Sequence, residues 1–524
     1  MKNLQKIFLN LKIGAWDKKK HYKIYLLKIN KMATTTYRDI IGNNSNLAPS
    51  QLMTLSVPNK NNKKVKDLLT RDITFSDNGN EVGSVNYISK SPKYFIRAKA
   101  LQRESFLPFI TNQTSIPIRP QVFTNFNLKE GDILISKDSN IGETVILDKD
   151  LPNHTISGAL YKLPIKEKKY YLFAFLKHGY FLKQLDLMVP KGSTIRHAKT
   201  LFLNCKIPFP NQKNKNEIIN YVELLTQAII SKEKEIRKKH QQILSEIERE
   251  LLENQKNNKF NYLLPTFNDI KDTFRIDAGY YCKTYKEKQY LIKNYKNGAK
   301  VLKKWGYSDK RGQNLQVSQI GKSILSDIPK DNFYTLIKPT NFSEFGTVEK
   351  FEYLGNPKEL SNLQAGDIVF SAEGTIGKCI LFVNPKDKWI TNIHGIVLNK
   401  INHDIIESAF VSCFLRFLRN FEILEYISVG GQGGSLAKKY WKDVLIPNFP
   451  NYKQEEVASL YHNLINYPKN LNSQNFLLAD QKWNENVGII ELDKSMKKLK
   501  KHLNTILDRI VENKTVDVIF EFDI

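Results

Sequence analysis

Two polar, glycine-bearing loops hold the residues best suited to contact a polyanion. The first contains Lys191, Gly192, Ser193, Thr194, Arg196, His197 and Lys199, and the second contains Gly430, Gly431, Gln432, Gly433, Gly434, Ser435, Lys438 and Lys439. Glycine lets a backbone approach a phosphate closely, hydroxyls and basic groups bind phosphate oxygens, and Gln or Arg can read base edges. Both loops are therefore candidate nucleic-acid-binding sites. The alternative is that each is only a turn between a helix and a strand.

Sequence motifs for catalysis are absent. The chain has no complete P-loop, no Pro-Pro dipeptide of the kind used by amino-methyltransferases, and no His-Glu-x-x-His zinc motif. Its nine histidines include no pair at metal-ligand spacing beside a carboxylate. We therefore predict a binding protein without catalytic residues or metal ligands of its own.

The net charge of +27 is concentrated in the globular parts of the chain. Residues 1–31 carry a net +8, and the helical stretch 213–256 carries only +1. A large basic surface favours a polyanionic partner, above all nucleic acid. The competing explanation is a codon bias that raises the lysine content everywhere.

Few cysteines and the absence of a long apolar run indicate a cytoplasmic protein. Cys205, Cys282, Cys379 and Cys413 are scattered and form no Cys-x-x-Cys pair, which fits a reducing compartment. No apolar run approaches the ~20 residues that a transmembrane helix needs. Residues 1–31 resemble a signal peptide only superficially, because Lys12 interrupts the apolar segment. We interpret them as a basic arm or as an extension upstream of the true start at Met32.

A long internal repeat determines the expected architecture. LKEGDILISKDSNIGETVIL (128–147) recurs as LQAGDIVFSAEGTIGKCILF (363–382), and GSTIRHAKTLFLNCKIPFP (192–210) recurs as GQGGSLAKKYWKDVLIPNFP (431–450). The same blocks in the same order indicate a duplicated domain. Within each copy, short β-rich runs alternate with turns, and a helical segment is expected near 169–185. Gly131, Gly142, Gly366 and Gly377 are interpreted as hairpin turn residues.

A long helix is expected after each copy. Residues 214–256 lack Pro and Gly, and Ile218, Val222, Leu225, Ile229, Ile236 and Ile243 form one apolar stripe. Lys232 and Lys239 interrupt this stripe, and we expect helix pairing to loosen there or a partner subunit to pack there. Residues 489–510 keep three-four spacing, after a polar insert at 470–487. The tail 517–524 alternates well enough for a short strand.

These predictions give an α+β fold with two duplicated mixed α/β domains and two long helices that pair as an antiparallel coiled coil. The expected boundaries are an N-terminal arm (1–63), a first domain (64–212), a central helix (213–256), a second domain (257–452) and a C-terminal helical region (453–524).

With these motifs, the sequence resembles the DNA-specificity subunits of type I restriction–modification systems. The resemblance is carried by the two GDI-containing blocks, by the strands that end KIPFP and LIPNFP, by the helix behind each, and by FRIDAGYY (274–281). It implies that each domain is a target-recognition domain for one half of a bipartite DNA site, and that the helices set the spacing.

The resemblance also implies a set of partners. The expected partners are double-stranded DNA, two methyltransferase subunits and translocating restriction subunits. The methyltransferase subunits use S-adenosylmethionine, and the restriction subunits need ATP and Mg²⁺. No cofactor is expected in this chain itself. Two alternatives are a single-chain restriction or modification enzyme with fused recognition domains, and a helical scaffold whose basic charge is incidental.

Overall fold

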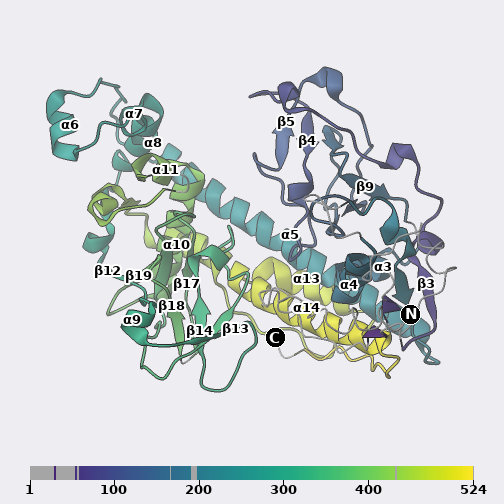
Figure 1. The fold of residues 1–524 in the computed structure, drawn as a ribbon. Helices are drawn as coiled ribbons and strands as arrows, with labels where there is room; N and C mark the ends of the chain where they lie inside the picture. Colours follow the sequence, from purple (N-terminus) through teal and green to yellow (C-terminus); the bar gives the residue numbers. More distant parts are fainter. Residues whose placement is uncertain are drawn as a thin grey trace, which may run out of the picture.

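A long helix and two flanking domains make up the computed structural model (Figure 1). The structure describes residues 58–165, 167–189, 197–386, 388–430 and 434–522, together with the strand pair β1 (Ile29–Asn30) and β2 (Thr54–Leu55). Almost all of the predicted basic arm, residues 1–31, lies outside this part. Helix α5 (Lys215–Glu253) crosses the molecule, with the first domain on one side and the second on the other.

Helix α5 forms because 39 consecutive residues contain neither Gly nor Pro and carry one apolar stripe. Its length is roughly 58 Å at ~1.5 Å per residue. The predicted stripe is buried throughout, at Ile218, Val222, Leu225, Ile229, Ile236 and Ile243. Helix α14 (Ile489–Val511) packs along it, and its own apolar positions are also buried.

The two long helices run in opposite directions. Gln212, just before α5, accepts a hydrogen bond of 2.6 Å from the backbone N–H of Val516, just after α14. Lys239, late in α5, donates to the carbonyl of Glu485, just before α14 begins. The coiled-coil form of this pairing stays a prediction.

The two lysines in the stripe do not loosen the packing. Lys232 is fully buried and donates to Asp480 at 2.6 Å and to Asn484 at 2.7 Å. Both partners lie on α13 (Phe476–Asn486), a helix formed by part of the predicted polar insert. The prediction of loosened pairing was wrong, because α13 supplies polar partners for the lysines.

The described part of the C-terminal tail does not form the predicted strand. Residues 514–522 have no ladder partner among the described residues. Phe520 instead packs its ring against Tyr221 and Phe476, and Phe522 packs on Phe476. Burial of these aromatic rings against the helices replaces strand pairing.

Two three-stranded sheets form the centre of the first domain. Their strand orders are β5-β4-β8 and β7-β6-β9. The strands are β4 (Tyr94–Ile96), β5 (Ser115–Pro117), β6 (Ile133–Ser136), β7 (Thr144–Ile146), β8 (His154–Ile156) and β9 (Leu160–Leu163). The predicted helical segment becomes α3 (Lys169–Lys177) and α4 (Gly179–Met188), which meet at His178. Strand β10 (Lys206–Pro208) pairs with β3 (Asn62–Lys64).

The second domain repeats this plan with sheets of four strands each. Their strand orders are β12-β19-β16-β17 and β13-β15-β14-β18. The strands are β12 (Ser308–Arg311), β13 (Ile324–Ser326), β14 (Tyr334–Ile337), β15 (Glu352–Gly355), β16 (Ile368–Ser371), β17 (Cys379–Leu381), β18 (Trp389–Thr391) and β19 (Gly395–Asn399). Strand β11 (Ala299–Val301) pairs with β20 (Leu445–Pro447) as β3 pairs with β10.

The remaining helices belong to the second domain and to the C-terminal region. They are α6 (Phe267–Thr273), α7 (Ala278–Tyr281), α8 (Lys283–Lys293), α9 (Val317–Ile320), α10 (Ile405–Asn420), α11 (Ile423–Ile427) and α12 (Asn451–Tyr461). No helix in the described ranges is both long and apolar enough to cross a bilayer.

Matching hairpins confirm the predicted duplication. Ile133 pairs with Ile146 across β6–β7, and Ile368 pairs with Leu381 across β16–β17. Gly142 and Gly377, which close the two turns, have φ values of 81° and 86°. Such angles favour glycine, and a Cβ at either position would also meet a leucine side chain from the helix behind it. The predicted α+β fold with two duplicated domains is thus the observed one.

Candidate nucleic-acid interface

In the first domain, the β6–β7 hairpin contacts the end of the first candidate loop. The backbone N–H of Ala198 donates to the carbonyl of Lys137 at 2.7 Å. Beside it, Nδ1 of His197 lies 2.6 Å from the Asp138 carboxylate, and Nζ of Lys137 lies 3.4 Å from the same carboxylate. The His197 side chain is 54% exposed. The hairpin therefore presents a carboxylate held between a lysine and an accessible imidazole.

The β16–β17 hairpin makes the corresponding backbone contact in the second domain. The N–H of Leu436 donates to the carbonyl of Ala372 at 2.9 Å, and Glu373 forms an isolated antiparallel bridge with Ser435. The Glu373 carboxylate accepts from Arg311 at 2.8 Å and lies 2.6 Å from Nδ1 of His394. Each hairpin thus joins one candidate loop and carries a carboxylate that is paired with a cation and a histidine.

The surroundings of Glu373 stabilise its ionised form. The hydrogen bond with His394 lowers the pKa of this carboxylate most, and the hydrogen bond from Arg311 lowers it further. Partial burial opposes these effects but does not overcome them. Glu373 therefore holds both partners as an acceptor of hydrogen bonds.

The predicted contact residues divide between described and undescribed parts of the chain. His197 and Lys199 are exposed beside the first hairpin, and Ser435 is half-buried beside the second. Lys438 and Lys439 lie in a short 3-10 helix, Lys438–Asp443, where the structure describes their backbone. The residues outside the described ranges are Lys191, Gly192, Ser193, Thr194, Arg196, Gly431, Gln432 and Gly433.

Sequence reasoning missed several residues of these junctions. Asp138 and Glu373 occupy the same position in the repeated block, so comparison of the two copies could have singled them out. Arg311 and His394 lie far from Glu373 in the chain, and no spacing pattern connects the three. Strand pairing alone brings Arg311 beside Ile396, next to the turn that holds His394.

The FRIDAGYY segment anchors the second domain behind its loop. Arg275 is buried, forms a two-bond pair with Asp277, and donates to the carbonyls of Tyr426, Ile427 and Ser428 at the end of α11. These carbonyls immediately precede the second candidate loop. Arg275 therefore fixes the point from which that loop departs.

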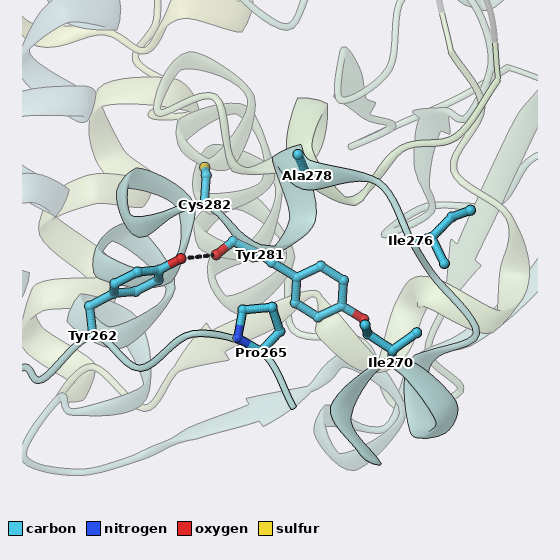
Figure 2. A pocket seen from close by; sticks show the side chains of 7 residues that line it. All are labelled: Tyr262, Pro265, Ile270, Ile276, Ala278, Tyr281 and Cys282. Carbon is cyan, nitrogen blue, oxygen red and sulfur yellow. Dashed lines mark hydrogen bonds between the residues drawn. The ribbon is translucent and has the colours of Figure 1, made fainter. Parts of the chain in front are cut away.

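The same segment lines part of an apolar hollow (Figure 2). It is lined by Tyr262, Pro265, Ile270, Ile276, Ala278, Tyr281 and Cys282. The Tyr262 hydroxyl donates to the carbonyl of Tyr281 at 2.9 Å. The Tyr281 hydroxyl donates to the carbonyl of Arg275 at 3.0 Å. These hydrogen bonds brace the wall of the hollow.

The described residues contain no group of three or more His, Cys, Asp or Glu side chains placed to hold a metal ion. The expectation that this chain carries no cofactor of its own stays a prediction.

A family comparison matches one continuous stretch of the chain. Residues 96–262 match the family model described as the type I restriction modification DNA specificity domain. This part of the chain is similar to type I specificity domains. The resemblance inferred from the sequence motifs is thereby confirmed. The matched residues of the specificity domain run from β4 through the whole of α5 and stop at Tyr262.

Solved structures that are similar to this chain include an S subunit and an HsdS subunit. One is the S subunit of a type I restriction–modification system from M. genitalium, with 14% identity and a TM-score of 0.39, covering 86% of this chain and 95% of that one. Another is the HsdS subunit from Thermoanaerobacter tengcongensis, with 12% identity and a TM-score of 0.25, covering 82% and 95%. No curated protein matches the chain.

Proposed function

We propose that this chain is the DNA-binding specificity subunit of a type I restriction–modification complex. Each globular domain would read one half of a bipartite DNA target, and the chain itself would carry out no catalysis. The observation that carries the proposal is the match of residues 96–262 to a DNA specificity domain, combined with a second copy of the same hairpin and loop in residues 363–450.

The arrangement of the helices supports a spacing role. A rigid connection between two weak half-site readers makes the second contact effectively intramolecular, so the pair binds far more tightly than either reader alone. Helix α5 supplies the connection, and α13 and α14 pack along it. The buried Lys232–Asp480 pair fixes how α13 sits on α5.

Partner subunits would supply the chemistry. We expect two methyltransferase subunits with S-adenosylmethionine to dock on the helical region, and restriction subunits with ATP and Mg²⁺ to join them. The complex would act in the cytoplasm on double-stranded DNA. A net charge of +27 is consistent with this polyanionic partner.

Methylation mapping tests the proposal directly. The chain is co-expressed with a methyltransferase subunit encoded beside it, and modified bases are mapped across the genome. The expected result is methyladenine in a split motif with a fixed gap, lost when this chain is omitted. A continuous motif, or methylation independent of this chain, would overturn the proposal.

Two other functions predict different behaviour of the purified chain. A fused single-chain enzyme would turn over DNA alone when given S-adenosylmethionine or Mg²⁺, whereas a specificity subunit would not. A helical scaffold would bind protein partners without DNA binding that weakens steeply as salt rises.

A further inference from the structure

We propose that the carboxylate–histidine pairs Asp138–His197 and Glu373–His394 are matching contacts to the DNA backbone, one in each recognition domain. In each pair the carboxylate positions the imidazole, and the imidazole donates to a phosphate. This inference rests on the proposed DNA-binding function and adds named contacts and their chemistry to it.

Of the residues in the two pairs, only the carboxylates occupy equivalent positions in the sequence repeat. Asp138 and Glu373 are equivalent in the repeat, and the residues before them are Lys137 and Ala372. The N–H of Lys137 donates to the carbonyl of Ala159, and the N–H of Ala372 donates to that of His394. Ala159 in the first domain therefore corresponds to the histidine of the second.

The other partners are also exchanged between the domains. His197 of the first loop faces Asp138 across an antiparallel bridge, and Ser435 faces Glu373 in the same way. The cation beside Asp138 is its chain neighbour Lys137, whereas the cation beside Glu373 is Arg311 from β12. Duplication accounts for the carboxylate position but not for a histidine and a cation that arrive from different elements. The recurrence of the same three groups indicates a shared role.

The geometry leaves one side of each imidazole available. The contact to the carboxylate uses Nδ1 at 2.6 Å in both pairs, and the two histidine side chains are 54% and 53% exposed. Nε2 lies on the opposite edge of the ring. A protonated imidazole donates from both nitrogens, so it can bridge the protein carboxylate and a phosphate oxygen.

The charges favour this bridge. The imidazoles contact Asp138 and Glu373, and these carboxylates are paired with Lys137 and Arg311. A carboxylate, a cation and a protonated imidazole sum to one positive charge, and the sum is zero when the ring is neutral. A phosphate beside the ring stabilises its protonated form. A protonated ring therefore gives each pair the positive charge that attracts a phosphate.

A backbone contact fits the duplication better than a base contact. The two recognition domains would read different half-sites, so a base-reading group is expected to differ between them. Phosphate contacts position a domain without reading sequence and can be the same in both. The same three chemical groups in both domains therefore point to a phosphate ligand.

The test measures binding of the full chain to a mixed-sequence DNA duplex over a range of salt concentrations. The measurement is made at about pH 6 and about pH 8, on either side of the usual histidine pKa of ~6.5. We expect the wild-type slope of log K against log salt to be steeper at the lower pH by about 2, because each phosphate contact contributes ~0.9. The H197Q/H394Q variant is expected to show one slope at both pH values.

The carboxylate variants test the positioning role. D138N/E373Q keeps both rings but replaces each carboxylate with a neutral amide, which removes the negative charge that attracts the imidazolium, so the difference in slope between the two pH values is expected to be smaller than in wild type. H462Q is a matched control, because Nδ1 of His462 lies 2.7 Å from Glu491 in the helical region, away from both hairpins. It is expected to behave like wild type.

The outcomes separate the two proposals. Salt-independent or absent DNA binding by the wild type would overturn the proposed function. Normal wild-type binding with an unchanged pH-dependent slope in H197Q/H394Q would overturn the phosphate contacts and leave the function intact. If H394Q prevents folding, H197Q alone decides, with an expected change of about 1 in slope at the lower pH.

Discussion

The ammonium group of Lys232 lies 2.6 Å from the carboxylate of Asp480, 248 residues later in the chain, and both side chains are almost completely buried. Asn484 and the ring of Trp483 surround the same ammonium, and the Tyr467 hydroxyl donates to Asp480. Burial lowers the pKa of Lys232, and the attraction of Asp480 opposes that effect. A fully satisfied polar cluster therefore joins α5 to α13.

Removing one member of this pair should destabilise the fold strongly. K232M leaves Asp480 buried without its main partner, and breaking a buried ion pair in this way typically costs ~3–5 kcal/mol. Thermal and urea unfolding measure the effect. The double variant K232M/D480L should recover most of the loss, because both charges are then absent. K238M changes an exposed lysine of the same helix and should have little effect.

The buried imidazole of His240 should make stability depend on pH. Burial, aided by Arg416, lowers its pKa from 6.5 to about 4. The unfolded chain therefore binds the proton first, and the free energy of unfolding falls as the pH drops through this range. From about pH 7 to about pH 5 the expected contribution is about 2 kcal/mol.

The variant H240L should lose less stability over that pH interval than wild type. Urea denaturation at both pH values gives the difference. H403Q, which changes an exposed histidine, serves as the control and should follow the wild-type curve. An equal loss of stability in H240L and wild type would show that His240 is not responsible.

The turn glycines of the two hairpins should tolerate no side chain. Gly142 and Gly377 have positive φ values, and a Cβ would also press on Leu182 and Leu185, or on Leu424. G142A and G377A are each expected to reduce stability by ~1–3 kcal/mol, measured by thermal unfolding. Gly179 begins α4 with open space around its Cα, so G179A should be neutral or slightly stabilising.

The basic residues of the two candidate loops should contribute to DNA affinity. R196A/K199A and K438A/K439A each remove two positive charges, so each is expected to reduce the slope of log K against log salt by about 2. K482A/K501A removes two exposed lysines of the helical region and should leave DNA binding by the chain alone unchanged. Unchanged binding by both loop variants would mean that the loops are only turns.

The sequence by itself determined the elements whose signal is local or repeated. The apolar stripe from Ile218 to Ile243 predicted α5, because helical periodicity depends on neighbours three or four residues apart. The repeated GDI blocks predicted the matching hairpins and their turn glycines, because a two-residue alternation and a tight turn are encoded within a few positions.

Only the tertiary structure decided how distant polar groups are satisfied. Lys232 looked like a flaw in the apolar stripe because its partner Asp480 follows 248 residues later. The tail around Phe520 resembled a strand because an alternating sequence does not reveal what its side chains pack against. His394 and Arg311 join Glu373 through the pairing of strands far apart in the chain. Buried and clustered charges depend on three-dimensional neighbours, which sequence spacing cannot specify.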